Sequence, residues 1–481
     1  MEKIIIEVSN SYGQIQGLKS LAIIDELSRL LSFISEATRF SFAVKSGRWD
    51  GRTRLLSRKL EFPSGLLDDV VRFLIGRSFD VEIKDKRVAL EIETSLDWTG
   101  PSLRNYQESA VDVAISKGRG MMKLATGAGK TNIISAIVGH YNTTTIVYVV
   151  SLDLLNQVKE TLEKGLSVPI GMIGDGNCKI EKINVVSVWS AASAFNEKYT
   201  STEEDVKADT WSPSDQQKKD IRDLVGAANL IILDEAQFAA ADSIQTLIKK
   251  SDSAAHRFGF SGTPWRSDGA DILLTAAFGK TIVDVRASDL IRSGWLVKPR
   301  IAFKTVPEKK EIKKNWAEVH SQYIVNNAER NQILMTGLNK MLELGRKPLV
   351  LFRDLKHGRI IEELLPKDSK YKMITGALSL DEREQIKADF KDGKLDLLLA
   401  SSVFDQGVDL PGLDALVLAG GGKSTAKSLQ RIGRVIRAAP GKKDALVLET
   451  WDQCHFVKKH SQMRKDAYGW EDEFTVSLQS K

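Results

Sequence analysis

The stretch that decides the fold is Met121-Met122-Lys123-Leu124-Ala125-Thr126-Gly127-Ala128-Gly129-Lys130-Thr131. It joins an apolar strand candidate, Met121–Leu124, to Asn132–Val138, whose apolar residues have helical spacing. A strand, a glycine loop ending in Gly-Lys-Thr and a helix form the P-loop arrangement, in which backbone N–H groups at the helix N-terminus surround phosphates. We therefore expect a nucleotide to bind at Thr126, Gly127, Ala128, Gly129, Lys130 and Thr131.

The loop departs from the generic P-loop at one position, because Leu124 stands where the pattern begins with glycine. A Thr-Gly-x-Gly-Lys-Thr core without that glycine is usual in helicase-like motors. The alternative is a chance glycine turn, which the strand before the loop and the helix after it disfavour. In the P-loop interpretation, Lys130 reaches the β- and γ-phosphates and the Thr131 hydroxyl binds Mg²⁺.

A second motif places two adjacent acids at the end of an apolar strand, in Leu230-Ile231-Ile232-Leu233-Asp234-Glu235-Ala236-Gln237. Such acids are costly to bury unless something binds them. We expect Asp234 to hold Mg²⁺, directly or through water, and Glu235 to orient or activate the attacking water, with Gln237 also catalytic. The alternative is that the acids only cap the next helix, which the upstream P-loop disfavours.

A third motif, Gln430-Arg431-Ile432-Gly433-Arg434-Val435-Ile436-Arg437, carries two arginines three residues apart, Arg434 and Arg437. This spacing predicts that they share one face of a helix. The alternative is an ordinary basic amphipathic helix. In the catalytic interpretation, both arginines reach a γ-phosphate held by an earlier domain, so that nucleotide binding closes a cleft between two domains and hydrolysis releases it.

The 481 residues suggest about three domains. From about residue 102, short apolar runs alternate with helical patterns, as in parallel sheets covered by helices. The series pauses around Val297–Glu318, and the polar stretch Asn196–Asp220 is expected to be an inserted loop or a charged helix. We predict domains at 1–97, 98–298 and 299–481, with strands at Thr145–Val150, Ile183–Val188, Leu230–Leu233, Leu349–Phe352, Leu397–Ala400, Leu416–Leu418 and Leu446–Leu448.

Residues 1–97 predict a small α+β domain. Ile4–Val8 is a strand candidate, Leu66–Leu74 has the spacing of an amphipathic helix, and Val81–Ile83 with Val88–Ile92 indicates a hairpin. The alternating stretch Phe40–Val44 leads into a basic cluster, in which six cations against one acid, Asp50, give +5 of the chain's net +6. Such a cluster is typical of a polyanion-binding face, and a solvated hairpin face is the equal alternative. Its cations are Lys45, Arg48, Arg52, Arg54, Arg58 and Lys59.

The composition excludes several classes of protein. With 42% hydrophobic and 27% charged residues, the chain is close to the average for soluble globular proteins and is not wholly disordered or collagenous. No run of about 18 apolar residues occurs, so we expect no membrane helix, and the first ten residues have too short an apolar core for a secretory signal. With only Cys178 and Cys454, we expect neither a disulfide framework nor a cysteine-rich metal site, and a cytoplasmic setting.

Together, the three motifs resemble those of a superfamily 2 helicase or translocase. Leu103–Gln107 resembles the adenine-reading element of that family, Ser261-Gly262-Thr263 resembles the motif that couples the ATP site to nucleic acid, and Asp405–Asp409 resembles the segment that joins strand contact to the ATP cleft. The resemblance implies ATP contacts at Arg104, Gln107, Gly407, Asp409 and Gln430, and nucleic-acid contacts at Ser151, Trp189, Arg353, Ser401 and Ser402.

The chain also departs from family patterns. Val150-Ser151 replaces the usual Pro-Thr of the first nucleic-acid motif. Asp-Glu-Ala-Gln and Ser-Gly-Thr differ from the Asp-Glu-Ala-Asp and Ser-Ala-Thr of one large RNA-helicase family. Both of these differences argue against a typical RNA helicase of that kind.

The first block is similar to the N-terminal domain of the UvsW-type helicases of tailed phages. The similarity rests on Gly47-Arg48-Trp49-Asp50-Gly51-Arg52, on Arg54-Leu55-Leu56 and on Phe62–Leu66. It implies an enzyme that remodels forks, recombination intermediates and R-loops. The arginines would contact phosphate. Trp49 is either a hydrophobic plug beneath a glycine turn, which we favour, or a residue that stacks on an exposed base.

We therefore expect an α/β chain of two RecA-like parallel-sheet domains, with ATP and Mg²⁺ between them, and a small N-terminal α+β DNA-binding domain. The expected function is that of an ATP-dependent DNA helicase or translocase that acts on branched or duplex DNA and on RNA–DNA hybrids. We expect a monomer with no membrane partner, located in the cytoplasm, which is that of the host if a phage encodes the protein. The alternatives are an RNA helicase, a motor subunit of a restriction system, and a non-catalytic DNA-binding protein switched by ATP. The intact pair of Asp234 and Glu235 argues against the last.

Overall fold

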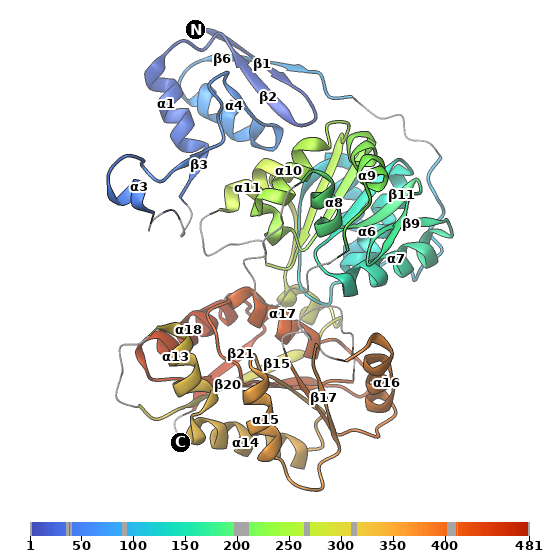
Figure 1. The fold of residues 1–481 in the computed structure, drawn as a ribbon, viewed down its shortest axis with the longest axis vertical. Coiled ribbons are helices and arrows are strands. Elements are labelled where there is room, and N and C mark those ends of the chain that lie inside the picture. The colour runs from blue at the N-terminus through green and yellow to red at the C-terminus, as the bar shows by residue number, and fades with distance from the viewer. Residues whose placement is uncertain are drawn as a thin grey trace. The chain divides into compact units, whose positions relative to one another are not determined.

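The structure is a computed structural model that describes residues 2–34, 38, 41–88, 94–196, 211–263, 270–308, 315–376, 378–401, 410 and 412–479. Helices and strands alternate along most of the chain (Figure 1). The chain divides into two compact units, Met1–Leu124 with Gly129–Asp284 and Ala125–Ala128 with Val285–Lys481. The second unit thus begins before residue 298, because it includes α12 (Ala287–Arg292). The division into three domains stays a prediction.

The first unit opens with a four-stranded sheet in the order β5-β2-β1-β6. β1 pairs antiparallel with β2 and parallel with β6. Ile4, Ile6 and Val8 are buried and alternate with partly exposed Ile5 and Glu7, as expected of a strand with one face on a core. The predicted strand at Ile4–Val8 and helix at Leu66–Leu74 are confirmed. The main elements are β1 (Lys3–Val8), β2 (Tyr12–Gln16), α1 (Leu21–Leu30), β5 (Glu61–Pro63), α4 (Leu67–Gly76) and β6 (Asp80–Asp85).

The predicted hairpin after α4 is wrong in its turn. Lys84 and Asp85, expected in the turn, continue β6, whose neighbour in the sheet is β1. Val88 is not in a strand, and 89–92 lie outside the described residues. The charged side chains of β6 suggested a turn, but they are exposed on a strand at the sheet edge, where charge is tolerated.

A short two-stranded ribbon, β3 (Ser32–Phe33) with β4 (Thr53–Arg54), forms a separate sheet, and the segment between and including its strands carries four of the six cations of the basic cluster. Within the alternating stretch that leads into the cluster, Phe42–Lys45 forms the one-turn helix α3. Ser41 caps this helix, because its hydroxyl accepts a hydrogen bond from the Val44 N–H. We call residues 41–54 the α3 arm.

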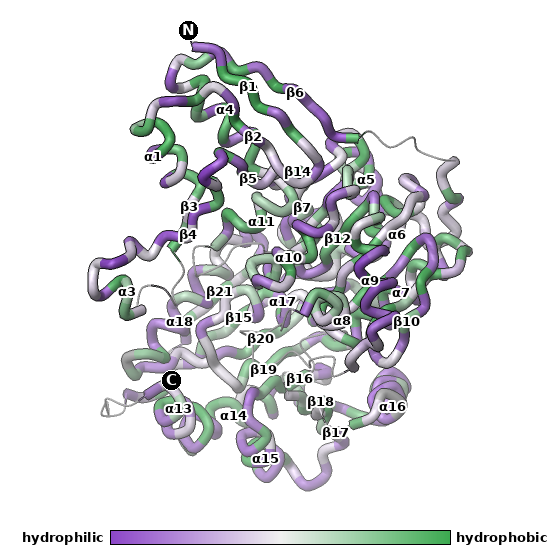
Figure 2. Tube along the Cα trace, turned by 45° about the horizontal axis from the view of Figure 1, so that its top comes forward, coloured by the Kyte–Doolittle hydropathy of each residue, from purple (hydrophilic) through white to green (hydrophobic). Residues whose placement is uncertain are grey.

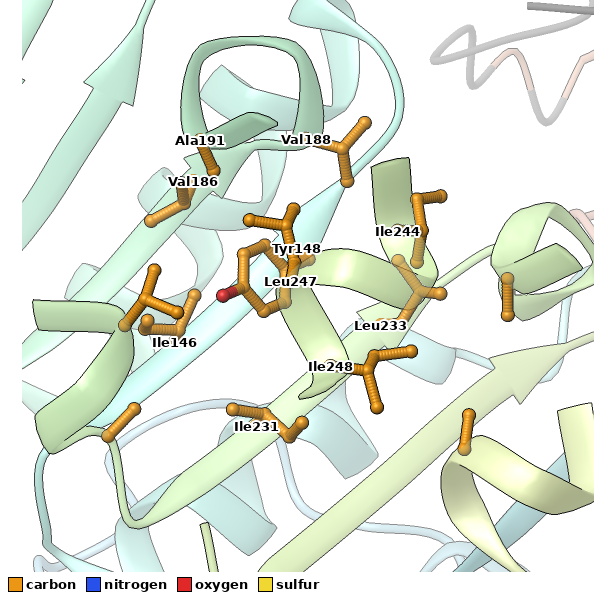
Figure 3. Close-up of a cluster of buried hydrophobic side chains, with 14 of the residues drawn as sticks. Ile146, Tyr148, Val186, Val188, Ala191, Ile231, Leu233, Ile244, Leu247 and Ile248 are labelled. Atoms are coloured by element: carbon orange, nitrogen blue, oxygen red, sulfur yellow. The ribbon is translucent and has the colours of Figure 1, made fainter. Parts of the chain in front are cut away.

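An eight-stranded sheet follows in the first unit, in the order β10-β9-β11-β8-β12-β13-β7-β14. Pairings from β9 to β7 are parallel, and β10 is antiparallel to β9. Alternate residues of β8, such as Ile146 and Tyr148, face a core built with α8, α9, α10 and α11 (Figure 3). The opposite face packs against α5, α6 and α7. Buried, near-continuous apolar strands therefore produced the expected parallel sheet covered on both faces.

The bounds of these elements confirm the predicted strands of the first α/β region. The strands are β7 (Arg119–Leu124), β8 (Thr145–Val149), β9 (Ile170–Gly174), β10 (Asn177–Lys179), β11 (Ile183–Ser187), β12 (Leu230–Asp234), β13 (His256–Ser261) and β14 (Thr281–Val285). The helices are α5 (Asn105–Lys117), α6 (Lys130–Tyr141), α7 (Leu152–Leu166), α8 (Val188–Ala194), α9 (Asp215–Ala227), α10 (Asp242–Lys250) and α11 (Asp271–Phe278). The hydrophilic helix α9 (Figure 2) accounts for the charged end of Asn196–Asp220, and 197–210 lie outside the described residues.

Two arginines, the buried Arg257 and the partly buried Arg119, fix the four-stranded block to the eight-stranded sheet within the first unit. Arg257, near the start of β13, donates to Ser11 Oγ at 2.8 Å and to the carbonyls of Ile248, Ser251 and Ala254. Arg119, the first residue of β7, donates to Ser64 Oγ at 2.9 Å. Burial lowers the pKa of Arg257 to about 10 and that of Arg119 to about 9, so both stay charged at neutral pH.

The second unit contains a seven-stranded sheet in the order β17-β18-β16-β19-β20-β15-β21, with parallel pairings. Its strands are β15 (Lys298–Thr305), β16 (Pro348–Leu351), β17 (Tyr371–Ile374), β18 (Leu397–Ala400), β19 (Ala415–Leu418), β20 (Asp444–Trp451) and β21 (Thr475–Gln479). Its helices are α13 (Trp316–Val319), a π-helix at His320–Val325, α14 (Ala328–Glu343), α15 (Leu355–Glu363), α16 (Leu380–Lys391), α17 (Thr425–Val435) and α18 (His455–Tyr468).

The expected pause in the strand series at Val297–Glu318 is wrong, because β15 lies there. Pro299 suggested a break. It is tolerated because β15 pairs with β21 only from Arg300 onward, so at Pro299 the paired neighbour is Ala445 of β20 alone. Among the described residues, no helix is both long and apolar enough to cross a membrane.

Candidate active site

The predicted P-loop lies between β7 and α6. Gly127 and Gly129 have φ of +90° and +71°, a region that glycine enters without a steric penalty. Gly129 is the N-cap of α6, so the helix begins at Lys130. A Cβ on Gly129 would lie 2.5 Å from Nε2 of Gln107, so only glycine allows this side chain to approach the loop. Gln107 is held in place because its Oε1 accepts a 2.9 Å hydrogen bond from the Arg104 N–H.

Lys130 contacts both acids of the second motif. Its Nζ lies 2.9 Å from Glu235 Oε1 and 3.4 Å from Asp234 Oδ1. Burial alone would lower the pKa of Lys130, but the two carboxylates raise it above its usual value, so the ammonium stays charged. Burial and the Glu235 charge raise the pKa of Asp234, and Lys130 opposes them. The three groups, at the start of α6 and at the end of β12, form one charged centre.

Glu235 has an unusual backbone conformation, with φ of +57°. A non-glycine residue there is uncommon and costs about 1–3 kcal/mol, so it persists only where the surroundings impose it. The Glu235 N–H donates a 2.9 Å hydrogen bond to Asp234 Oδ1. The left-handed backbone conformation of Glu235 ends β12, and the carboxylates of Asp234 and Glu235 both contact Lys130.

A chain of hydrogen bonds runs from Glu235 to the Ser-Gly-Thr motif. Gln237 Nε2 donates to Glu235 Oε2 at 2.8 Å, and Ser261 Oγ donates to Gln237 Oε1 at 2.6 Å. The Thr263 N–H in turn donates to Ser261 Oγ at 3.1 Å. β12 and β13 are neighbours, so their ends bring these residues together. The motif resemblance identified Ser261 but gave it no place among the expected catalytic residues. The hydrogen bond to Gln237 joins Ser261 to the expected catalytic residues.

The donor set suits Mg²⁺ bound together with a nucleotide. Among the described residues, no three His, Cys, Asp or Glu side chains gather as a metal site. Mg²⁺ commonly takes one or two carboxylates and completes its shell with substrate phosphates and water. Asp234, 3% exposed, is such a carboxylate, and Thr131 lies in the first turn of the helix that follows the P-loop.

Two of the expected nucleic-acid contacts lie close together: Ser151 follows β8, and Trp189 lies on α8, which follows β11. Ser151 is buried and caps α7, accepting a hydrogen bond from the Leu154 N–H at 3.4 Å. Trp189 donates from Nε1 to the carbonyl of Val150 at 3.3 Å, and its ring packs partly buried against the core. Both side chains therefore have structural roles in addition to the contacts proposed for them.

The arginine motif of the second unit is not one helix face. Gln430 and Arg434 lie on α17, but the helix ends at Val435. Arg437 instead forms a β-bridge with Leu296, so the prediction that both arginines share a helix face is wrong. The spacing argument failed because it assumed that the helix continued. Elsewhere in this unit Arg353 is exposed and Ser401 is buried, whereas Ser402, Gly407 and Asp409 lie outside the described residues.

The cations of the basic cluster, four of which lie on the α3 arm, are presented in two ways. Lys45, Arg48, Arg58 and Lys59 are exposed. Arg54 donates to both oxygens of Asp50, and this partner holds the pKa of Asp50 below its usual value. Arg52 donates to Ser32 Oγ at 3.2 Å, joining the two strands of the ribbon. The cluster is therefore partly exposed charge and partly the internal structure of the arm.

Comparison with known families matches three parts of the chain. Residues 8–84 match the family described as DNA helicase UvsW, N-terminal, residues 100–266 match Type III restriction enzyme, res subunit, and residues 329–439 match Helicase conserved C-terminal domain. The ATP-dependent DNA helicase uvsW of Enterobacteria phage T4 is 25% identical over 92% of this chain and 89% of its own length. The DNA 3'-5' translocase XPB2 of Sulfurisphaera tokodaii is 26% identical over 79% of this chain and 88% of its own length.

Solved structures support the fold. The ATP-dependent Type ISP restriction-modification enzyme LlaBIII bound to DNA superposes with a TM-score of 0.57 and 14% identity, over 80% of this chain and 32% of that one. The chain is a superfamily 2 helicase, an ATP-dependent enzyme with two RecA-like domains. This class is defined by the two mainly parallel sheets, the P-loop, the paired acids and the matches to the two helicase-type families over residues 100–266 and 329–439. Within that superfamily, the N-terminal match and the alignment over 92% of the chain show that it is similar to the UvsW-type DNA helicases.

Proposed function

We propose that the protein uses ATP hydrolysis to unwind or branch-migrate DNA at forks, junctions and R-loops. The observation that carries this proposal is that the basic α3 arm, within the UvsW-like block, belongs to the same compact unit as the centre of Lys130, Asp234 and Glu235. A charged arm attached to a nucleotide-hydrolysing centre suits a motor that must hold DNA while it works.

In the proposed reaction, Lys130 neutralises charge on the β- and γ-phosphates, and Thr131 and Asp234 would hold Mg²⁺, which supplies further charge neutralisation when it is bound. Glu235 orients the attacking water and accepts its proton. Gln107 and Arg104 contact the adenine. Positioning and charge neutralisation dominate phosphoryl transfer, so a preformed lysine–carboxylate centre is suited to it.

Coupling to DNA is proposed to run through Gln237 and Ser261, which connect Glu235 to the Ser-Gly-Thr motif. Ser261 is the last residue of β13, and the P-loop follows β7. At the other ends of these two strands, Arg119 of β7 and Arg257 of β13 donate hydrogen bonds to the N-terminal block. From the second unit, Arg434 and Arg437 are proposed to stabilise the charge that develops on the transferred phosphoryl group, while Gln430, Gly407 and Asp409 contact the nucleotide.

DNA contacts are proposed at three places. The basic cluster contacts phosphates of duplex or branched DNA. Ser151 and Trp189 contact one strand from the first unit, and Arg353, Ser401 and Ser402 contact it from the second. RNA–DNA hybrids, as in R-loops, form a further substrate class of this proposal.

The test is ATP-dependent unwinding and annealing by the full chain on forks, four-way junctions, R-loops and blunt duplexes, with ATPase stimulation by RNA measured beside them. We expect branched DNA to be processed faster than blunt duplex, and RNA to stimulate weakly. Stimulation by RNA alone would identify an RNA helicase. Translocation on duplex DNA without a preference for branches would identify a motor of the restriction type, and binding without phosphate release would identify an ATP-switched DNA-binding protein.

A further inference from the structure

Phe42, the first residue of α3, has the largest exposed fraction among the aromatic side chains of the described residues. It is 75% exposed, whereas the next, Trp470, is 55% exposed. The backbone beneath it is well held: the N–H groups of Arg48 and Trp49 both donate to the carbonyl of Ala43, at 3.0 and 3.1 Å. Phe42 is therefore exposed on a turn that is held by backbone hydrogen bonds.

The other apolar residues of the α3 arm point inward. A Cβ on Gly51 would lie 3.1 Å from Cγ2 of Val44, so Val44 packs against the turn. Trp49 is partly buried, and its Nε1 donates to the carbonyl of Arg52 at 3.2 Å. This contact supports the plug interpretation of Trp49. The arm thus partly buries its tryptophan and its valine and leaves its phenylalanine exposed.

The exposed ring lies among cations. The guanidinium carbon of Arg48 lies 6.0 Å from the centroid of the Phe42 ring, and Lys45 follows on the same short helix. Both cations are exposed. The neighbouring acid, Asp50, is engaged by Arg54. An exposed aromatic face with cations beside it matches a nucleotide, whose base stacks on a ring while its phosphate meets a charge.

We propose that Phe42 stacks on an unpaired base at the branch point of DNA, with Lys45 and Arg48 holding the adjacent phosphates. The inference rests on the proposed function, because it requires that branched DNA is the substrate. In fully paired DNA every base is stacked between its neighbours, so Phe42 adds little there. The cations bind any phosphate backbone, whereas Phe42 confers a preference for branches.

The test compares Phe42→Ala, Phe42→Leu and Phe42→Trp in the full chain, with Leu21→Ala as the matched control. Leu21 is 82% exposed at the start of α1 and lies outside the basic cluster. The probes are a fork with unpaired bases at its branch and a blunt duplex of the same length. Phe42→Ala should lose about tenfold in fork affinity, as expected for one stacked base, and less than about twofold in duplex affinity. Phe42→Trp should keep fork affinity, Phe42→Leu should lose it, and Leu21→Ala should match the wild type.

A photocrosslink locates the contact independently. A fork carrying 5-iodouracil at the branch should crosslink to Phe42, and one carrying it within the paired arm should not. Three results would each overturn the stacking role. They are equal fork affinity in Phe42→Ala and the wild type, wild-type fork affinity in Phe42→Leu, and equal losses of affinity for fork and duplex in Phe42→Ala. A wild-type protein with no fork preference would contradict the proposed function itself, so the two failures are distinguishable.

Discussion

The charged centre of the first unit and the α3 arm use charge in opposite ways. At the centre, Lys130 and Asp234 are largely buried, and lysine and carboxylates neutralise one another at 2.9 and 3.4 Å. On the arm, Lys45 and Arg48 are exposed to solvent, and so are Arg58 and Lys59 just after it. Buried charges require partners because desolvation is costly, whereas exposed cations remain available to a polyanion. The comparison separates a site built for chemistry from a surface built for binding.

The largest effect is expected at the centre. Glu235→Gln should keep nucleotide binding but lower turnover by about 10²–10⁴-fold, because the amide cannot accept a proton from water. The measurement is phosphate release with saturating ATP and DNA, beside nucleotide affinity by equilibrium binding.

Lys130→Ala is the companion variant. It should weaken nucleotide binding as well, because it removes a positive charge from the phosphate site and leaves two acids without their cation. Near-normal DNA-stimulated ATPase in Glu235→Gln would refute the role of Glu235. It would also reduce the charged centre to a structural ion pair.

The next effect tests whether the hydrogen-bond chain couples DNA to hydrolysis. Gln237→Leu removes the 2.8 Å bond to Glu235 and the 2.6 Å bond from Ser261. Since a hydrogen bond to a charged group contributes about 1.5–3 kcal/mol, DNA-stimulated turnover should fall by about 10–100-fold. Measuring ATPase with and without DNA separates this loss from a loss of basal activity.

Ser261→Ala sharpens the same test. It leaves the bond between Gln237 and Glu235 in place, so basal turnover should survive while stimulation by DNA falls. Equal losses of basal and stimulated activity in both variants would mean that the chain only supports the site and does not transmit DNA binding.

The centre could be predicted from the sequence because its chemistry fixes its local geometry. A strand, a glycine loop and Gly-Lys-Thr leave few backbone arrangements, and acids after a buried strand need a cation nearby. Its long-range contacts could not be predicted. Nothing in the sequence shows that Gln107 packs against Gly129, or that Gln237 bonds to Ser261, because these contacts depend on strand order.

The arm was harder to predict because charge clusters specify no fold. Six cations were compatible with a polyanion-binding face or a solvated face and did not show which of them remain exposed, and the alternating apolar residues before them did not reveal that Ser41 caps a helix. Likewise, three-residue spacing could not reveal that α17 ends between Arg434 and Arg437. In each case a local pattern was overridden by a cap or a helix end, for which it carried only a weak signal.

The exposed cations should appear in the salt dependence of DNA binding. Replacing Lys45, Arg48 and Arg58 together with Ala should flatten the dependence of log affinity on log salt by roughly three units, since each phosphate contact contributes about −0.9. Basal ATPase should not change. Fluorescence anisotropy with duplex DNA across a salt series measures the slope.

The pair of Arg54 and Asp50 is the matched control on the same arm. Arg54→Ala should change the slope by less than about one unit, because its charge is already engaged by Asp50. Asp50→Asn should steepen the slope by about one unit, because it frees Arg54 for phosphate. An unchanged slope in the triple variant would mean that the cluster is only a solvated face, and that the grip on DNA lies elsewhere in the chain.

The smallest effect should come from Trp49, which the comparison assigns to the structure of the arm and not to its binding surface. Trp49→Ala removes partly buried packing and the 3.2 Å bond from Nε1 to the Arg52 carbonyl, so the arm should lose about 1–2 kcal/mol of local stability, less than the 3–5 kcal/mol typical of a fully buried Trp. Hydrogen exchange at the amides of Arg48 and Trp49, which bond to Ala43, should quicken accordingly, whereas Phe42→Ala should leave their protection unchanged. Fork binding should fall only as far as the arm opens, and Trp49→Phe should restore most of it by refilling the apolar space. If Trp49→Ala instead left hydrogen-exchange protection unchanged and abolished fork binding, Trp49 would be the residue that stacks on a base. The stacking role proposed for Phe42 would then be wrong.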